Sequence, residues 1–266
     1  MKKTILIVVV VLLIAAPIFI YVHYFTGPNP AVLKDYSGDV EVNGEKPKKG
    51  QSLSQGDQVS SEKGEATLVF FGNSILRLDK NTQISIKKLE ADTSTVGIKQ
   101  KKGRTWSRAV RKIKAPYTGV LGGVEEYSVD TPTAVATVRG TSFSAVKDKV
   151  SVVKGTVTMV KGDLEEQVSN ATAVTEDGME VKSLERNQWI EENLEKDRKF
   201  DREYLKELLD RYPVIVKFVK DRYNATEEEI KSYIRKRGVK EIRDRIDKRL
   251  EGESLESLED KGLNEE

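Results

Sequence analysis

Few side chains in this sequence are suited to nucleophilic catalysis or to metal binding. The 266 residues include no cysteine, and His23 is the only histidine. Thiol chemistry, disulfides and a lipid anchor on cysteine are therefore excluded, and the usual triads and histidine metal sites lack the residues they need. The carboxylates show no pair at the spacing of a calcium loop or a glycosidase motif. We expect no enzyme activity, no metal site and no cofactor.

A basic run between Thr93 and Val124 is the clearest candidate for a binding surface, because it contains eight basic residues and no acidic one. Trp106, Val110 and Ile113 are spaced as on one face of a helix, which predicts a short helix with an apolar stripe and a basic face. Such a helix would lie on anionic lipid or on an acidic cell-wall polymer. In the alternative interpretation, Trp106 is a strand residue of a β core and the basic side chains form a solvated rim. The candidate contact residues are Lys99, Lys101, Lys102, Arg104, Trp106, Arg108, Arg111, Lys112 and Lys114.

The charge of the whole chain gives little reason to expect a nucleic-acid partner. The net charge is only +2, although 33% of the residues are charged. The chain therefore lacks a strong overall positive field, and a base-stacking surface would need more aromatic residues. We expect no nucleic-acid binding.

Short alternating segments separated by glycines occupy the centre of the chain. The alternation of apolar with polar residues, with a period of two, predicts strands with one buried face. It occurs around residues 40–42, 58–59, 66–71, 75–78, 84–86 and 96–98. Gly72 and Asn73 predict a two-residue hairpin turn, and residues 118–123 predict a flexible loop. The expected fold class is mainly β, a sandwich or roll of short antiparallel strands.

The most distinctive stretch of the sequence is Asp130–Val146. Apolar residues fall at every second position over Ala134–Val138, and the alternation resumes one residue out of phase after Gly140. A slip of this kind predicts a bend that re-aims a strand between two faces. Thr131-Pro132 predicts an extended strand entrance. Arg139 is expected to satisfy carbonyl groups or a carboxylate beside the bend, with a ligand contact as the alternative.

An apolar stretch near the start, Ile5 to Phe25, is long enough to cross a membrane, since about 20 residues at roughly 1.5 Å each span the hydrocarbon core. Phe25 stands where a cleaved signal peptide would have a small residue, which favours an uncleaved signal anchor over a cleaved peptide. Lys2 and Lys3 predict that the N-terminus stays inside and that the bulk of the chain is extracytoplasmic at the cell membrane. The predicted order is a cytoplasmic stub at 1–4, a single-pass transmembrane anchor at 5–25 and a linker at 26–35.

From Arg186 onward the period of the apolar residues changes from 2 to 3.6, which predicts helices. One helix would begin near Trp189, and Asp201 would start a second one as its N-cap. We expect a helical domain at 185–250, whose alternating charges indicate a solvated face, with partner docking or DNA binding as the alternative. Residues 251–266 are acidic, lack aromatic residues and are expected to be disordered.

Several motifs together resemble the FecR domain. In chain order they are GDVEV at 38–42, GQSLSQGDQV at 50–59, ATLVFFGNSILRL at 66–78, Lys102-Gly103 with Trp106, Thr131-Pro132, VRGTSF at 138–143 and GTVTM at 155–159. The resemblance covers about residues 36–184. Its signature residues, to which we assign a structural role, are Thr131, Pro132, Val138, Arg139, Gly140, Thr141 and Phe143. It implies an extracytoplasmic β-rich domain, best known from regulators that sense an outer-membrane transporter and signal to a sigma factor.

The resemblance leaves two interpretations of function. Such regulators carry a cytoplasmic anti-sigma segment before the membrane helix, and the stub at 1–4 is too short to be one. The first interpretation is therefore a non-enzymatic binding or scaffold protein of the cell envelope, whose FecR-like domain engages a macromolecular partner or ligand. The alternative is a signal-sensing subunit that relays an external event through its transmembrane helix to a membrane partner. Binding of anionic lipid or cell-wall polymer is compatible with either.

Overall fold

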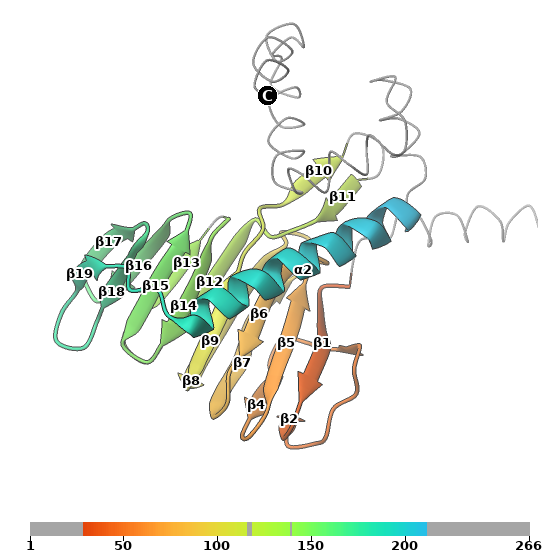
Figure 1. Ribbon diagram of the computed structural model, residues 1–266, viewed down its shortest axis with the longest axis horizontal. Coiled ribbons are helices and arrows are strands. Elements are labelled where there is room, and N and C mark those ends of the chain that lie inside the picture. Colours follow the sequence, from red (N-terminus) through yellow and green to blue (C-terminus); the bar gives the residue numbers. More distant parts are fainter. Residues whose placement is uncertain (1–28, 116–118, 139, 212–266) are drawn as a thin grey trace, which may run out of the picture. The chain divides into compact units, whose positions relative to one another are not determined.

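Two β-sheets and one helix make up most of the described structure (Figure 1). The computed structural model describes residues 29–115, 119–138 and 140–211. Within these residues, the nine strands of sheet A are, in spatial order, β19 (Glu180–Ser183), β18 (Ala171–Val174), β15 (Lys149–Lys154), β14 (Ser142–Val146), β9 (Arg104–Arg108), β6 (Ser74–Leu78), β5 (Glu65–Phe70), β1 (Ala31–Ser37) and β3 (Gln51–Ser52).

Sheet B has eight strands in the same described ranges. In spatial order they are β17 (Leu164–Val168), β16 (Val157–Lys161), β13 (Val135–Val138), β12 (Glu126–Asp130), β8 (Thr95–Lys102), β7 (Thr82–Glu90), β4 (Gln58–Ser61) and β2 (Val40–Val42). A separate hairpin consists of β10 (Ile113–Ala115) and β11 (Gly119–Gly122), and the helix is α2 (Gln188–Arg211).

One hydrophobic core draws residues from both sheets. Alternate residues along the strands are buried, as in β12, where Tyr127 and Val129 are covered and their neighbours are not. Tyr127 of sheet B meets Phe70 and Phe143 of sheet A edge to face, with ring centroids 6.3 and 6.4 Å apart. Aromatic rings prefer this geometry, and it holds the two sheets in contact. The mainly β fold predicted from the alternation is confirmed.

The strand ends form two opposite rims. At the arch rim the chain crosses between the sheets at residues 38–39, 62–64, 79–81 and 103. The arches stack through backbone hydrogen bonds, because Glu62 N donates to Asp39 O at 3.0 Å and Asn81 N donates to Glu62 O at 2.9 Å. At the other ends of the strands lies the entry rim, which comprises residues 29–30, 71–73, 91–94, 109–112 and 122–125.

One strand pair departs from the antiparallel prediction. β8 and β12 run parallel, with Val96 opposite Tyr127 and Ile98 opposite Val129. Between them the chain leaves sheet B for β9 in sheet A, forms the β10–β11 hairpin and returns to sheet B. Parallel neighbours require a crossover of this kind, and residue alternation alone does not reveal it.

The bend predicted at Gly140 is confirmed, and it moves the chain from one sheet to the other. Val138 ends β13 in sheet B, and Ser142 begins β14 in sheet A. Gly140 lies between them with φ of +92°, a backbone conformation that glycine adopts without strain. Residues on the two sides of the bend can thus face the same core from opposite sheets.

The extended entrance predicted at Thr131-Pro132 is wrong. Asp130 and Val135 are register partners in the antiparallel pair β12–β13, so residues 131–134 form the turn that joins these strands. Thr131 N donates to Ala134 O at 2.8 Å, and the Thr131 hydroxyl accepts from Ala134 N at 3.1 Å. Pro132 is exposed within this turn. The fixed φ of proline suits a tight turn as well as an extended segment, so the Thr-Pro pair alone does not distinguish the two.

The predicted linker at 26–35 is wrong in its second half. β1 begins at Ala31, and both Ala31 and Leu33 are fully buried. The register with β5 shifts between Leu33 and Asp35. This irregularity interrupts the alternation and hides the strand in the sequence.

Two predicted connections also differ from the structure. The turn between β5 and β6 has three residues, Phe71 to Asn73, since Phe70 pairs with Ser74. Phe71 itself adopts a positive φ of +46°, which its side chain does not favour and the Gly72-Asn73 signal does not suggest. The expected flexible loop at 118–123 contains β11, whose Val120 pairs with Lys114 of β10.

α2 is a single helix, so the predicted break at Asp201 is wrong. Its N-cap is Asn187, whose side-chain oxygen accepts from Ile190 N at 3.1 Å. Asp201 lies within the helix, and Arg198 bonds Glu195 across one turn just before it. Within the described ranges no helix combines the length and the apolar character that crossing a bilayer requires. The predictions for 1–25, 212–250 and the tail at 251–266 lie outside the described residues.

The chain divides into two compact units, 1–193 and 194–266. The first contains both sheets, the β10–β11 hairpin and the beginning of α2 up to Asn193. The described part of the second is the remainder of α2, in which Phe200 and Tyr204 stack with ring centroids 6.2 Å apart.

Candidate functional site

The basic run does not form one surface. Gly103 takes the chain from sheet B to sheet A in the middle of the run, so its members lie in three places. Lys99, Lys101 and Lys102 are exposed on β8, Arg104, Trp106 and Arg108 belong to β9, and Arg111, Lys112 and Lys114 lie at or near the entry rim. The predicted helix through Trp106 is wrong, because residues 104–108 form a strand with a period of two.

Trp106 occupies the outer face of sheet A and contacts the start of α2. It is fully buried, yet it is not part of the core between the sheets. Its ring meets the Trp189 ring edge to face, at a centroid distance of 6.1 Å and an interplanar angle of 81°. The strand assignment in the alternative interpretation is thus right, but the covering partner is a helix residue and not the opposite sheet.

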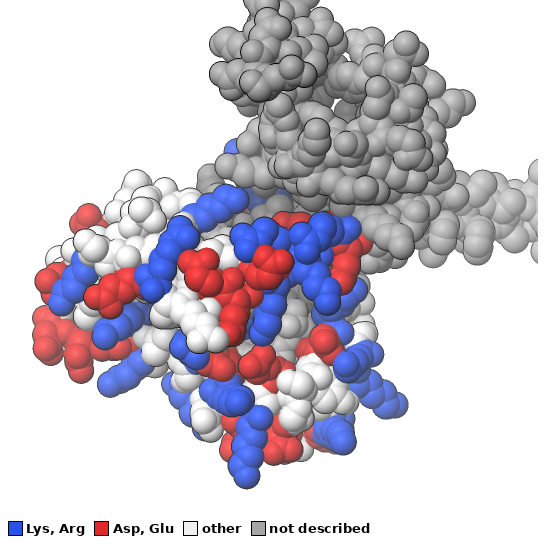
Figure 2. Space-filling view, in the orientation of Figure 1, with Lys and Arg blue, Asp and Glu red and all other residues white. Residues whose placement is uncertain are grey.

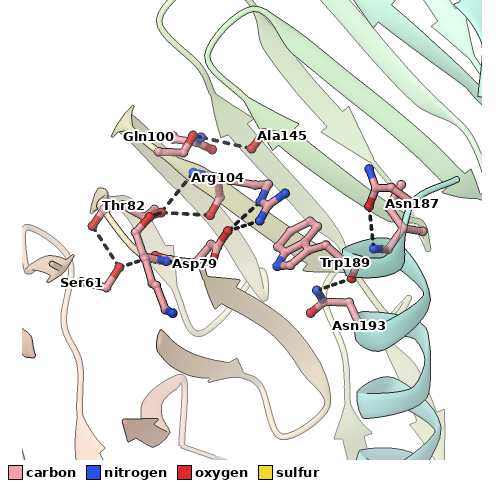
Figure 3. Close-up of polar contacts among 12 residues, drawn as sticks. Ser61, Asp79, Thr82, Gln100, Arg104, Ala145, Asn187, Trp189 and Asn193 are labelled. Atoms are coloured by element: carbon pink, nitrogen blue, oxygen red, sulfur yellow. Dashed lines mark hydrogen bonds and ion pairs between the residues drawn. The ribbon is translucent and has the colours of Figure 1, made fainter. Parts of the chain in front are cut away.

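Arg104 also contacts the Trp189 ring (Figure 3). Its guanidinium carbon lies 4.1 Å from the Trp189 ring centroid, which is a cation–π contact. The same guanidinium forms an ion pair with Asp79, with Nε donating to Asp79 Oδ2 at 2.7 Å. Asp79 thus fixes the guanidinium in the position from which it stacks on Trp189.

A second tie joins α2 to β6 one turn further along the helix. Arg77 Nη1 lies 3.4 Å from both the backbone oxygen and the side-chain oxygen of Asn193. Asn193 in turn donates to the Trp189 carbonyl at 2.9 Å. We call Arg77, Asp79, Arg104, Trp106, Trp189 and Asn193 the docking cluster. It holds residues 188–193 on the outer face of sheet A through an aromatic pair, a cation–π contact and the hydrogen bonds of Arg77 to Asn193.

A buried polar network supports β9 from the opposite side. Gln100 of β8 donates to Gly103 O at 2.8 Å and to Ala145 O at 3.2 Å, and it accepts from the Thr105 hydroxyl at 2.8 Å. Thr82 donates to Arg104 O at 3.1 Å and accepts from Arg104 N at 3.0 Å. Satisfied buried networks of this kind rigidify their surroundings, so the strand that carries Trp106 is firmly placed.

The basic residues are engaged to different degrees. Arg108 is buried and donates to Asn73 O at 2.8 Å, and Lys101 donates to Gln58 Oε1 at 2.9 Å on the outer face of sheet B. Lys99 lies next to Asp130, which pairs with Lys87 at 2.5 Å. Figure 2 shows basic and acidic residues interspersed over one face of the described chain. A single anionic-surface patch made of all nine predicted residues is therefore excluded.

Of the signature residues, Val138, Thr141 and Phe143 are buried, whereas Pro132 and Gly140 are exposed. Val138 and Phe143 enter the core from opposite sheets, and Thr141 donates to Thr156 O at 2.7 Å. Arg139 lies outside the described residues. Burial against Phe70 and Phe143 raises the pKa of Tyr127. A hydrogen bond of 3.1 Å with the Ser107 hydroxyl lowers this pKa, but by less than burial raises it. Val138, Phe143 and Tyr127 thus belong to the core between the sheets.

Sequence reasoning missed the docking cluster apart from Arg104 and Trp106. The pattern around it gave no signal, because Arg77 and Asp79 alternate with the core residues Leu76 and Leu78. Charged residues that alternate with apolar ones are typical of a strand whose outer face is in water. The cluster can bind and position a helix. Among the residues described, no group of three or more His, Cys, Asp or Glu side chains is placed to hold a metal ion.

Part of the β domain is similar to a known protein family. Residues 57–163 match the family model described as FecR protein, within the region from 36 to 184 that carries the resemblance. No curated protein sequence matches the chain. Two solved structures of a candidate anti-sigma factor from Parabacteroides distasonis ATCC 8503 are similar, at 15% and 16% identity with TM-scores of 0.38 and 0.37. Each alignment covers 48% of this chain, and the chain spans 60% of the length of those chains.

Proposed function

Because the chain carries a FecR domain over residues 57–163, we propose that it is a non-enzymatic regulatory protein of the cell envelope. Its β domain binds a protein partner outside the membrane, and the segment at 5–25 relays that binding to a partner in the membrane. The FecR match carries this proposal, because the family is best known for regulators of this kind. It supports a regulatory role better than it supports a static scaffold.

Through the docking cluster, a partner bound to the β domain could change the position of α2. Arg77 and Asp79 extend from β6, and Arg104 and Trp106 belong to β9, two neighbouring strands in the middle of sheet A. A partner that binds on this face beside β6 and β9 would change the contacts of Trp189 and hence the start of α2. Packed elements of this type switch between discrete arrangements more readily than they deform gradually.

Partner capture tests the proposal. Full-length tagged chain is extracted in mild detergent and its partners are quantified by mass spectrometry. The matched control is the same chain with residues 5–25 replaced by an unrelated transmembrane helix of equal length. We expect one extracytoplasmic partner with both chains and a membrane partner only with the native one. Identical partners for the two chains would argue against relay through this segment.

The orientation is tested separately with intact cells. Protease added outside should degrade the bulk of the chain, because the proposal places residues 26–266 outside the membrane. Full protection of the chain, in cells whose surface proteins are digested, would overturn the proposed location.

A further inference from the structure

Sheet A extends one strand beyond sheet B at the end of the β domain that contains β17, β18 and β19 (Figure 1). The chain passes from β17 to β18 through Ser169 and Asn170, and these two strands contact each other across the sheets. β19 is the next strand of sheet A, and no described strand continues sheet B beyond β17. We call the open edge of β17 together with the inner face of β19 the step.

Two exposed apolar side chains lie at the step. Val181 of β19 is the register partner of Ala173, which belongs to the core, so Val181 points to the inner side of sheet A. It is nevertheless 44% exposed, because no described strand of sheet B lies over it. Leu164 of β17 is on the same face of its strand as the buried Val168, yet it is 52% exposed. A strand added beside β17 would cover part of both side chains.

The open edge of β17 offers backbone groups to such a strand. Lys161 and Leu164 are register partners across the two-residue turn at 162–163, which begins with a glycine at a φ of +57°. A hairpin of this type closes with a hydrogen-bonded pair, and the residues that follow alternate between the two sides of the strand. Glu165 and Gln167 therefore direct their N–H and C=O groups away from β16. A strand edge of this kind is a template for a further strand.

A lysine holds β19 in place relative to β17. Lys161, at the end of β16, reaches the turn between β18 and β19. Its Nζ donates to the backbone oxygens of Glu176 at 3.0 Å and Gly178 at 3.2 Å, and also to that of Thr175. An ammonium group has three donors, and here each one meets a carbonyl oxygen. The step is thus formed before any partner binds, which lowers the cost of binding.

The charges at the step select the kind of strand that fits. The exposed acidic residues on β17 and on the two adjacent turns are Asp163, Glu165, Glu166, Glu176 and Asp177. Lys161 is bound to the turn, and Lys182 lies on the outer face of β19, where it pairs with Glu180 at 2.9 Å. A second copy of the chain at β17 would bring carboxylates against carboxylates, which is unfavourable in a sheet. A basic strand would instead form pairs of opposite charge.

We propose that the step binds an extended segment of the extracytoplasmic partner, which adds to sheet B beside β17 and carries adjacent basic residues opposite Glu165 and Glu166. The proposal rests on the proposed function and names how the β domain holds its partner. Main-chain hydrogen bonds join the strands, and apolar residues beside the two bases cover Val181. β19 ends at Ser183 and α2 begins at Gln188, so only a short connection separates the step from the docking cluster.

Binding of synthetic peptides to the full chain tests the proposal. The probe is a short fluorescent peptide with two adjacent lysines between valines, and the control peptide has glutamates in place of the lysines. Fluorescence anisotropy with the purified full chain in detergent should show saturable binding of the lysine peptide. This binding should be about tenfold tighter than that of the glutamate peptide, because two charge pairs change sign. Equal affinities, or no saturable binding, would overturn the proposal.

Two variants place the peptide at the edge of β17. Gln167→Pro removes an outward N–H but keeps the bonds to β16, and should abolish binding. Glu165→Lys with Glu166→Lys should reverse the preference in favour of the glutamate peptide, and it serves also if the proline variant does not fold. The matched control, Glu176→Lys with Asp177→Lys, makes the same charge change on the adjacent turn and should keep most of the affinity. Equal losses in the two charge variants would indicate attraction without strand pairing and would overturn the proposal.

Partner capture separates this proposal from the proposed function. We expect the native chain to retain its extracytoplasmic partner and the Gln167→Pro chain to lose it. Capture by both chains would contradict only the strand addition. Capture by neither would contradict the proposed function, and this proposal with it.

Discussion

Trp189 meets Trp106 edge to face at a centroid distance of 6.1 Å, and this contact joins the first helical turn after the β domain to the outer face of sheet A. Trp106 is fully buried by it, although it points away from the core between the sheets. The β domain therefore has two apolar contacts, one between its sheets and one beneath the start of α2. The second is the smaller and depends on few residues, which makes it accessible to mutation.

Trp189→Ala should release residues 188–193 while leaving the β-sheets intact. The substitution removes the aromatic pair and the cation–π contact, and we expect a loss of about 1–3 kcal/mol in the free energy of unfolding. Hydrogen exchange should accelerate in residues 188–193 and stay unchanged in β13 and β14. Gln188→Ala, an exposed position on the same turn, is the control and should change stability by less than about 0.5 kcal/mol. Equal exchange in both variants would show that the helix start is held by other contacts.

Arg104 and Trp189 should be energetically coupled. In a double-mutant cycle of Arg104→Ala and Trp189→Ala, we expect a coupling energy of about 1 kcal/mol, since the guanidinium is partly solvated. Arg104→Lys should lose most of this coupling although it keeps the charge, because an ammonium cannot both stack on the ring and pair with Asp79 through two nitrogens. Urea denaturation of the single and double variants measures it. Additive effects would contradict the contact.

Glycine substitutions should separate backbone strain from steric clash. Gly140→Ala meets nothing closer than Arg111 Cβ at 3.9 Å, so its cost comes from the φ of +92° and should be about 1–3 kcal/mol. Gly155→Ala adds a Cβ 2.7 Å from Gly140 O at a φ of +82°, and should cost more than Gly140→Ala. Gly178→Ala has open space and should stay within about 0.5 kcal/mol of the parent chain. Thermal unfolding of the three variants gives the ranking, and a reversed order would contradict it.

Tyr127 should make the domain sensitive to alkali. Burial raises its pKa above the value of about 10 for an unfolded tyrosine. The neutral form is therefore favoured in the folded state, and stability is retained below pH 10 and lost as the pH rises above it. Tyr127→Phe should cost about 1 kcal/mol at pH 8, because it removes the hydrogen bond with Ser107. Above pH 10 its disadvantage should shrink by about 1.4 kcal/mol per pH unit. Urea titrations of the parent chain and of Tyr127→Phe from pH 8 to 11.5 measure the difference. If both proteins lost stability equally as the pH rises, Tyr127 would not have this role.

The β domain was largely predictable because its strands alternate cleanly. The period-two pattern from Ala134 to Val138 and its slip at Gly140 indicated two strands that serve different faces, and the structure places them in different sheets. β1 was missed because the register shift after Leu33 breaks its alternation. The parallel pairing of β8 with β12 depends on contacts between residues distant in the sequence, and the pattern within a single segment does not reveal such contacts.

The candidate site was harder to predict because one run of basic residues crosses between two sheets. Trp106, Val110 and Ile113 have helical spacing by coincidence, whereas Arg104, Trp106 and Arg108 have the period of the strand that forms. Trp189 was assigned to a helix correctly, but the identity of its partner on β9 is a tertiary contact. Asp201 resembled an N-cap, yet helical pairs such as Glu195 with Arg198 continue α2 up to this residue.

If this chain relays a binding event across the membrane, gene expression should respond to it. Transcript levels are compared in cells with the native chain, without it, and with the chain whose residues 5–25 are replaced by an unrelated transmembrane helix. We expect a defined set of transcripts that changes on deletion, returns with the native chain and does not return with the replaced segment. Full restoration by the replaced chain would contradict relay through this segment, and unchanged transcripts on deletion would contradict a regulatory role.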